Sequence, residues 1–465
     1  MKQQEVIAIA MKICQPTISS AEKMEKVSSL VIEKMKGSIN QLANDKIVGF
    51  SLGGSFAKGT WVNEDRDLDI FVKIDPSRDK EEFEDLGIKI GRLVLGDYKP
   101  YLRYSEHPYV EAEIGDIRIN IVPCYNVKLG DWKSAADRSP FHTIFMLERL
   151  SDAMKSQVRI LKMFLKSIGI YGAQLSVGGF SGYVTEILIL KYGSFLQVIE
   201  LIASLNHEKF VIALSSPNLE SIDAFTSKII IIDPIDNNRN LGAAISADSL
   251  GKFILAARSF LENPSLEFFK KAETSLDNRI IEKIKANLLV VEFEIRKRSP
   301  DILWGQLKKS LNALSKQLDM AGFNAIGSTC ITDEKKYAAF VFFMEFMELP
   351  PFCVRPGPEV FRKDDTEIFL SNKKDDLVPF WINRNMKVLT ISKRSKVHAK
   401  DYASEILSGK VAGVGLNKDV AADLRLGFNI YSGNERELNK SIIFALSKLM
   451  LNDRRIINSE KGRRH

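Results

Sequence analysis

The chain has 465 residues, a hydrophobic fraction of 45% and a formal net charge of +7. This length exceeds what one hydrophobic core normally serves, so we expect roughly two to four domains, and the apolar content argues against a disordered chain. No run of about 18 uninterrupted apolar residues occurs, and Lys12 interrupts the short apolar patch near the start. These features argue against a membrane span and a signal peptide, so we expect a cytoplasmic protein that contacts no membrane.

The cysteines form neither a metal pattern nor a disulfide pattern. No C-x-x-C pair occurs and no histidine lies nearby at ligand spacing, so we expect neither a zinc site nor a disulfide framework. Buried thiols are the expectation, above all at position 124, which has apolar neighbours. The cysteines are Cys14, Cys124, Cys330 and Cys353.

Positive charge gathers at the C-terminal end, in Arg454-Arg455 and Lys461-Gly462-Arg463-Arg464. Clustered positive charge favours a polyanionic partner. Basic tails are about equally often solvated and without a partner, so both interpretations stay open.

The first predicted element is a helix from Ser19 to about Ala43. The spacing of Ser19 and Glu22 is that of a capping box, which marks a helix start. Apolar residues that share one helical face follow, at Met24, Val27, Leu30, Val31 and Met35. We expect this surface helix to pack on a sheet.

Strand and helix signals then alternate. Residues 47–52 predict a strand, Gly53-Gly54 a turn and residues 68–72 a second strand. The next segment has helical spacing of its apolar residues, which are Phe83, Leu86, Ile90 and Leu93. This order predicts a mixed sheet covered by helices.

The following segments, 109–114 and 117–122, alternate in polarity and are separated by Gly115-Asp116. A two-residue turn of this type predicts a β-hairpin. In that register Glu111 lies directly across from Asn120, and both side chains point to the same face.

From residue 151 to 265 the pattern becomes mainly helical. Four apolar residues share a helical face, namely Val158, Leu161, Phe164 and Leu165. Residues 187–192 predict a buried helix, and a strand at 229–232 ends at Asp233-Pro234, where proline stops ladder pairing.

Beyond residue 266 the signals are mixed. Residues 303–318 predict a helix, residues 337–344 and 387–391 predict strands, and Arg355-Pro356-Gly357-Pro358 predicts a break. We therefore expect domains at 1–150, at 151–265 and at 266–465, the last being an α+β region of one unit or two.

Two carboxylates converge at the start of the second strand. Asp67 and Asp69 are two residues apart, so both point to one face while Leu68 points into a core. Two negative charges held close together need a compensating positive charge. Mg²⁺ can supply it, because it binds carboxylates together with phosphate oxygens. Ahead of them, Gly54-Ser55 leaves backbone amides and a hydroxyl free for a triphosphate. By itself, a glycine turn of this kind most often only reverses the chain and binds no ligand. A pair of aspartates two residues apart is, by itself, most often exposed to solvent.

The order of strand, Gly-Ser turn, short helix and Asp-x-Asp strand is a sharper signal than its parts. It resembles the signature of the DNA polymerase β nucleotidyltransferase superfamily. In that superfamily the two carboxylates ligate the metal pair that clamps the attacking and leaving oxygens. The resemblance implies a mixed-sheet nucleotidyltransferase head at the N-terminus.

Longer strings are similar to one family, the archaeal class I CCA-adding enzymes, which are tRNA nucleotidyltransferases. The similarity is dense over residues 45–265 and thinner afterwards. The matching strings are GSFAKGTW at 54–61, EHPYV at 106–110, IVPCY at 121–125, DRSPFH at 137–142, RILK at 159–162, GIYGA at 169–173, GFSGY at 179–183 and DPIDNNRN at 233–240. The resemblance implies an α+β multidomain fold with a helical central domain and an RNA-binding C-terminal region.

The resemblance also implies the site. The reaction would be template-independent addition of C, C and A to the 3′ end of tRNA from CTP and ATP. Mg²⁺ would be held by Asp67, Asp69 and the residue at the third acid position. The nucleotide-binding residues would be Gly54, Ser55, Lys58, His142, Lys162, Tyr171 and Arg239. The C-terminal region would hold the acceptor stem and elbow of tRNA by shape and phosphate contacts, and a homodimer is an open possibility.

These roles have plainer alternatives. Lys162 and Tyr171 suit triphosphate oxygens, but alone they would be interpreted as a solvated helix lysine and a core aromatic. Arg239 has the planar donor fork that reads a base edge. His142 and His107 are single histidines, and a single histidine is more often structural.

This chain departs from the family at the third acid position, where it has Asn120. Alternation keeps Asn120 on the active face, so geometry is retained while the charge is lost. Loss of a general base typically costs about 10²–10⁴ in rate. An engineered substitution and a natural variant with compensation both account for it, and Glu111 is the candidate for compensation. A milder departure is Lys58, where the family usually has arginine.

Two other functions compete with CCA addition. A poly(A) polymerase or oligoadenylate synthase shares the Gly-Ser and Asp-x-Asp elements. A catalytically silent tRNA-binding protein of the same fold is the alternative that Asn120 suggests. Nucleotide incorporation into tRNA lacking its terminal residues separates the three.

Overall fold

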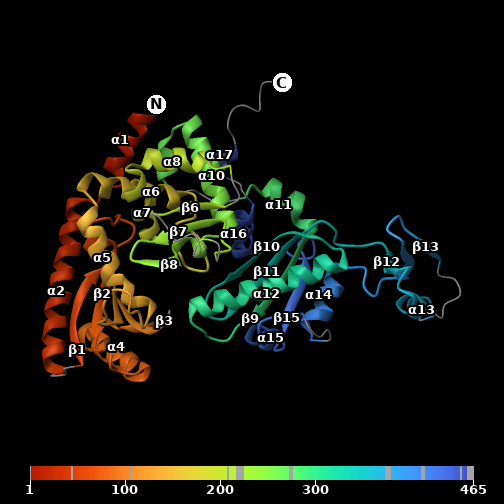
Figure 1. The fold of residues 1–465 in the computed structure, drawn as a ribbon, viewed down its shortest axis with the longest axis horizontal. Coiled ribbons are helices and arrows are strands. Elements are labelled where there is room, and N and C mark those ends of the chain that lie inside the picture. Colours follow the sequence, from red (N-terminus) through yellow and green to blue (C-terminus); the bar gives the residue numbers. More distant parts are fainter. Residues whose placement is uncertain are drawn as a thin grey trace. The chain divides into compact units, whose positions relative to one another are not determined.

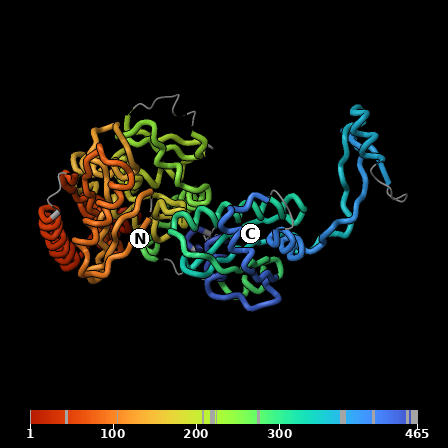
Figure 2. Tube along the Cα trace, turned by 90° about the horizontal axis from the view of Figure 1, so that it is seen from below, coloured from red at the N-terminus to blue at the C-terminus, as the bar shows by residue number. Residues whose placement is uncertain are grey.

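The structure is a computed structural model in which the chain forms two compact units. The first comprises Met1–Glu273, Ser299–Asp301 and Asp453–His465, and the second comprises Thr274–Arg298 and Ile302–Asn452. Apart from the C-terminal segment, the first unit is coloured red to green and the second green to blue (Figure 2). The structure describes residues 2–42, 46–104, 106–206, 209–215, 222, 225–271, 276–371, 379–409, 414–450 and 453–457. The boundary predicted at residue 150 falls inside the first unit and stays a prediction.

A five-stranded sheet forms the first part of this unit (Figure 1). Its strands are β1 (Ile47–Gly53), β2 (Asp67–Ile74), β3 (Tyr101–Tyr104), β4 (Pro108–Ile114) and β5 (Ile117–Tyr125). The spatial order is β1-β2-β5-β4-β3, with β2 and β5 parallel and the other pairs antiparallel. Ile114 pairs with Ile117, which confirms the predicted hairpin.

Helices cover the apolar face of this sheet. The helices up to residue 149 are α1 (Gln3–Ile13), α2 (Ile18–Leu42), α3 (Gly54–Lys58), α4 (Lys80–Leu95) and α5 (Arg138–Arg149). Of these, α1 packs in the core of the helical part and not on the sheet. One core joins α2 and α4 to the sheet, and its fully buried members include Val31, Met35, Phe83, Ile90, Leu68, Ile70, Ile119 and Ile121. The buried residues alternate along β2 and β5, so the opposite face is left for polar side chains.

Some local predictions for these helices are wrong. The hydroxyl of Thr17, not that of Ser19, accepts the backbone N–H of Ser20 at 3.2 Å and caps α2. Leu30 and Leu93 belong to the predicted buried faces, yet 38% and 41% of their surfaces are exposed. The apolar stripe of each helix is narrower than the face that spacing alone predicted.

The mainly helical part expected after residue 151 is present. Its long helices are α6 (Asp152–Ser167), α7 (Gly182–Tyr192), α8 (Phe195–Ser204) and α10 (Ala247–Glu262). A small sheet of β6 (Phe210–Ile212), β7 (Ile229–Asp233) and β8 (Asp236–Asn240) accompanies them. The predicted face of α6 is fully buried, in a cluster of phenylalanine rings centred on Phe164.

Within the described residues, no single helix has the length and apolar character needed to cross a membrane. Helices α7 and α8 meet the length and composition criteria only as a pair, with a bend of 94° between them. Most of their apolar residues lie in the core around Phe164.

The second unit is α+β, as expected. A four-stranded sheet has the order β10-β11-β9-β15 and packs against α12, and a three-stranded sheet has the order β12-β14-β13. Its strands are β9 (Leu288–Glu294), β10 (Ala325–Thr332), β11 (Tyr337–Met344), β12 (Phe352–Glu359), β13 (Phe380–Ile382), β14 (Lys387–Lys393) and β15 (Phe428–Ser432). Its longer helices are α12 (Pro300–Ala321), α13 (Lys363–Ser371), α14 (Ala399–Leu407) and α16 (Lys440–Leu449).

The break predicted at Arg355-Pro356-Gly357-Pro358 is wrong. These residues lie inside β12, which pairs with β14 through a register irregularity between Pro356 and Glu359. Strand β12 is at the edge of its sheet, where a proline without an N–H is tolerated.

Two further predictions concern thiols and the basic tail. All four cysteines are free; Cys14, Cys124 and Cys330 are buried, and burial raises the pKa of the Cys124 thiol to about 12. Arg455 is not a free tail charge, because it pairs with Asp453 and donates to the carbonyl oxygen of Ser167 at 2.9 Å. The basic run at 461–464 lies outside the described residues.

Candidate functional site

The Gly53-Gly54 turn lies directly beside Asp69, one of the two predicted carboxylates. Gly53 is the register partner of Asp69, and Gly54 has a φ of +65°, which favours glycine. A Cβ atom on Gly54 would lie 1.8 Å from Asp69 Oδ2. Only glycine therefore fits between the turn and the carboxylate. Ser55 follows in the first turn of α3 and is partly buried.

The two carboxylates each accept a hydrogen bond from the neighbouring strand. Asp69 and Asn120 are register partners on β2 and β5, and Asn120 Nδ2 donates to Asp69 Oδ1 at 2.8 Å. Arg118 is the register partner of Asp67, and its Nε donates to Asp67 Oδ1 at 2.7 Å. Burial is the largest cause that raises the pKa of Asp69; the nearby Asp67 raises it further, and the Asn120 hydrogen bond opposes the rise.

The oxygen atoms at this face suit a hard divalent cation. Asn120 Oδ1 is buried and has no hydrogen-bond partner in the described part of the chain. The Nδ2 of Asn120, not this oxygen, is turned toward Asp69. A half-turn of the amide would complete an all-oxygen donor set with the carboxylates of Asp67 and Asp69, which Mg²⁺ prefers. Among the described residues no group of three or more His, Cys, Asp and Glu side chains is placed to hold a metal. The amide of Asn120 is not among the residue types in such a group.

Glu111 lies where the hairpin register placed it, directly opposite Asn120. It is only 4% exposed. The hydroxyl of Tyr101, on β3, donates to Glu111 Oε1, and Arg103 Nε lies 3.5 Å from the same oxygen. Asp69, Asn120, Glu111 and Tyr101 thus occupy register positions across four strands, a set that we call the polar row.

A buried charge network connects α3 with the helical part. Lys58 is paired with Glu186 at 2.5 Å, and the hydroxyl of Thr60 donates to the other Glu186 oxygen at 2.6 Å. Lys162 is 1% exposed, and its Nζ donates to the Thr60 carbonyl at 2.9 Å. Burial lowers the pKa of Lys162 to about 8, although the carboxylate of Glu186 opposes this.

Tyr171 approaches the same network. A Cβ atom on Gly182, at the start of α7, would lie 3.0 Å from the Tyr171 hydroxyl and 3.6 Å from Lys162 Nζ. Burial raises the pKa of Tyr171 well above its usual range, so the phenol stays protonated. The structure therefore brings Lys58, Lys162 and Tyr171 together, as the family resemblance implied.

His142 and Arg239 converge on one buried acid. His142 Nε2 lies 2.8 Å from Asp233 Oδ2, and Arg239 donates to the same oxygen at 3.2 Å. The imidazole of His142 packs on the ring of Tyr183, with 3.9 Å between ring centroids. Burial is the main cause that lowers the pKa of His142, although Asp233 opposes it. Both predicted residues thus belong to one cluster, which Asp233 organises.

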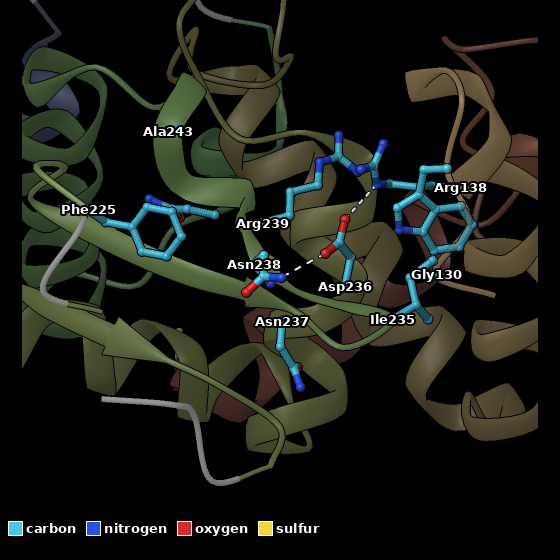
Figure 3. A pocket seen from close by; sticks show the side chains of 11 residues that line it. Gly130, Arg138, Phe225, Ile235, Asp236, Asn237, Asn238, Arg239 and Ala243 are labelled. Atoms are coloured by element: carbon cyan, nitrogen blue, oxygen red, sulfur yellow. Dashed lines mark hydrogen bonds and ion pairs between the residues drawn. The ribbon is translucent and has the colours of Figure 1, made fainter. Parts of the chain in front are cut away.

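A pocket of about 700 Å³ opens beside this cluster (Figure 3). Its lining comes from the segment before α5, from Phe225 and from the hairpin of β7 and β8. Two of its lining residues, Arg138 and Asp236, form an ion pair 2.8 Å long, and the Arg138 guanidinium lies 5.2 Å from the Trp132 ring centroid. Lining residues include Trp132, Arg138, Asp236, Asn238, Arg239 and Asn240. Aromatic, amide and guanidinium groups around one cavity suit a flat, polar ligand such as a base.

Arg118, Glu186 and Asp233 were not predicted from the sequence. Arg118 had a usable signal, because it precedes Asn120 by two residues and so shares its face. Glu186 was a single acid beside a strongly apolar helical run, and its partners come from residues more than 120 positions away. His107 has a packed setting, with Glu84 3.2 Å from its Nδ1 and the Phe83 ring at its edge.

This fold and site define a nucleotidyltransferase. Residues 32–146 match the nucleotidyltransferase domain family, residues 156–270 match the second domain of tRNA nucleotidyltransferases, and residues 285–433 match the C-terminal domain of CCA-adding enzymes. The CCA-adding enzyme of Pyrobaculum neutrophilum is 36% identical over 361 residues, which cover 77% of this chain and 83% of that protein.

Two more archaeal CCA-adding enzymes extend the match. That of Saccharolobus shibatae is 34% identical over 86% of this chain and 92% of its own length. That of Pyrobaculum islandicum is 31% identical over 92% of this chain and 97% of its own length. The chain belongs to the CCA-adding enzyme family.

Proposed function

We propose that this chain adds C, C and A, in that order, to the 3′ end of tRNA from CTP and ATP. The observation that carries the proposal is the convergence of Asp67, Asp69 and Asn120 on one face beside the Gly54 turn. In the reaction, the 3′ oxygen of the RNA forms a bond to the α-phosphorus of the nucleotide. The bond from that phosphorus to the bridging oxygen breaks, and pyrophosphate leaves.

We propose Mg²⁺ as the cofactor, held by Asp67, Asp69 and the Asn120 oxygen. Bound there, it would neutralise charge on the attacking and leaving oxygens. Two carboxylates and a buried, unpartnered amide oxygen that a half-turn would bring toward them support this choice. An amide oxygen cannot accept the proton of the 3′ hydroxyl, so this chain would perform the chemical step more slowly than a chain with aspartate at position 120, by about 10²–10⁴.

The remaining residues would bind and orient the nucleotide. Ser55 and the backbone around Gly54 would face the triphosphate, with Lys58, Lys162 and Tyr171 close by. The hydroxyl of Tyr171 and the ammonium of Lys162 can donate charge-assisted hydrogen bonds to phosphate oxygens. Arg239, held by Asp233, would present its guanidinium to the edge of the incoming base.

Incubation of the protein and Mg²⁺ with tRNA lacking its last three residues, with each labelled nucleotide in turn, tests the proposal. Addition of two C and one A followed by arrest is the expected result. Unlimited addition of A would instead indicate a poly(A) polymerase-like enzyme. Binding of tRNA with no elongation, even by Asn120→Asp, would indicate a silent tRNA-binding protein. Asp69→Asn serves as the inactive control.

The second unit would contact the tRNA beyond its 3′ end. Its match to the C-terminal domain of CCA-adding enzymes supports this role. We propose that it holds the acceptor stem and elbow through backbone shape and phosphates, since A-form RNA offers little sequence information to side chains. Binding should therefore weaken steeply with salt and vary little among tRNA sequences. Sedimentation of the free protein and of its tRNA complex would test the homodimer.

A further inference from the structure

The polar row gives the Asn120 amide two different neighbours. Asp69 lies on one side, on β2, and Glu111 lies on the other, on β4. All three are register partners, so their side chains point to the same face of the sheet. The row begins where the Gly54 turn meets Asp69.

Only one of the two polar atoms of the Asn120 amide has a hydrogen-bond partner among the described residues. Asn120 Nδ2 donates to Asp69 Oδ1 at 2.8 Å, while Oδ1 is buried without a partner among the described residues. This orientation turns the donor, not the acceptor, toward the carboxylates. A cation held by Asp67 and Asp69 needs the oxygen there. Half a turn about the Cβ–Cγ bond exchanges the two atoms, and Nδ2 then requires an acceptor on the opposite side.

Glu111 is suited to be that acceptor. Directly opposed residues on antiparallel strands have Cβ atoms about 4.5–5.5 Å apart, within reach of a glutamate side chain. The Glu111 carboxylate is buried and held from its far side by Tyr101 and Arg103. Both of these contacts use Oε1, and Oε2 has no hydrogen-bond or ion-pair partner among the described residues, so it can accept from the amide.

We propose that Glu111 is a positioning residue that accepts a hydrogen bond from Asn120 Nδ2 and so holds Asn120 Oδ1 toward a divalent cation at Asp67 and Asp69. The inference rests on the proposed function, because it concerns the same cation. It explains how an amide can stand at the third acid position. Asn120 supplies the oxygen, and Glu111, one strand away, fixes its direction. Groups that orient a metal ligand typically change metal affinity by about 10–100-fold.

Mn²⁺ binding to the full-length protein tests this, with the electron paramagnetic resonance signal of free Mn²⁺ as the measurement and no nucleotide or RNA present. Glu111→Gln should weaken binding about tenfold. The matched control is Glu113→Gln, which removes the same charge from the same face of β4 but opposite Arg118 instead of Asn120. The control should change affinity less than about threefold, as expected for a charge acting through solvent.

The same two changes in the Asn120→Asp protein complete the test. A carboxylate presents oxygen on either side, so it needs no orienting acceptor. The effect of Glu111→Gln should therefore shrink there to that of Glu113→Gln. Equal effects of the two glutamine variants in the Asn120 protein would overturn the inference. An effect of Glu111→Gln that is the same in both backgrounds would overturn it as well, since Glu111 would then act by charge alone.

Tyr101→Phe keeps the proposal testable if Glu111→Gln does not fold. Tyr101 is 42% exposed, so the change costs little packing, yet it removes the hydroxyl that holds Glu111. Mn²⁺ affinity should fall about threefold in the Asn120 protein and stay unchanged in the Asn120→Asp protein. An unchanged affinity in both would overturn the inference. The two proposals can fail separately. If the unsubstituted protein incorporates CMP and no Glu111 or Tyr101 variant loses Mn²⁺ affinity or activity, the inference fails and the proposed function stands. If the unsubstituted protein binds no Mn²⁺ and adds no nucleotide, the proposed function itself is refuted.

Discussion

The five-stranded sheet of the first unit and the small sheet β12-β14-β13 of the second differ in what lies behind them. In the first, Ile70, Ile119 and their neighbours are completely buried against α2 and α4. In the second, every residue of β13 is exposed, and α13 has no buried residue. The comparison indicates that the polar row keeps its geometry because the other face of the five-stranded sheet is packed against helices. The small sheet has few buried residues, among them Val388 and Thr390 on β14, and leaves an apolar surface open.

Truncation of one isoleucine in each sheet gives the largest expected contrast. Ile119→Ala removes a fully buried side chain and should lower the free energy of unfolding by about 2–5 kcal/mol. Ile382→Ala, at a position 57% exposed, should change it by less than about 0.5 kcal/mol. Urea unfolding followed by circular dichroism measures both. Similar losses from the two variants would show that the small sheet has a core of its own and would break the comparison.

The next largest effect is expected from a substitution that displaces Asp69 of the polar row without changing any charge. Gly54→Ala puts a methyl group 1.8 Å from Asp69 Oδ2. The required shift of Asp69 should lower kcat for CMP addition about 100-fold. The left-handed backbone of an alanine there should cost about 1–2 kcal/mol of stability.

Gly37→Ala is the matched control for this change. No atom lies within 4 Å of its added Cβ, and the residue is inside α2. The control should keep full activity and gain roughly 0.5–1 kcal/mol of stability. An active Gly54→Ala protein would mean that the position of Asp69 is not critical.

Part of the polar row could be predicted from the sequence because two local rules fix it, whereas Tyr101 and its strand β3 were not predicted. Alternation sets the face of Asp67, Asp69 and Asn120, and the two-residue turn sets the register that places Glu111. Both rules act over a few residues, so no knowledge of the rest of the fold is needed. The partner strand β2 follows from the same pattern, although its parallel pairing with β5 does not.

The parts that could not be predicted depend on distant neighbours. Asp233 and Glu186 gain their roles only when helices and hairpins from remote segments meet around them. The strand through Pro356 was missed because its position at a sheet edge, which makes proline acceptable, is a property of the assembled sheet. The exposure of Leu93 likewise depends on how much of α4 the sheet covers.

Changes at the pocket rim should alter nucleotide affinity and leave the row untouched. Arg239→Ala should raise KM for CTP and ATP about tenfold with little change in kcat, since it removes a contact present before and during the reaction. Arg239→Lys should not restore it, because a lysine lacks the planar fork. Arg149→Ala, which removes an exposed arginine paired with Glu148, is the control. A loss confined to kcat would instead place Arg239 in the chemical step.

The smallest expected effect is a pH dependence caused by Lys162. As the pH rises, the stability of the protein should increase while its affinity for CTP should decrease. The pKa of Lys162 falls from 10.5 to about 8 on folding, so between pH 8 and 10.5 the unfolded chain binds more protons and stability should rise with pH. Over the same window the folded protein loses the charge that would attract the triphosphate, and KM for CTP should rise about fivefold by pH 9. Lys162→Met should abolish both trends, whereas Lys155→Met, which removes an ammonium paired with Asp152 on the same helix, should retain them. Stability that rises while KM stays flat would mean that Lys162 serves only its buried contact with Thr60 and that the triphosphate binds elsewhere.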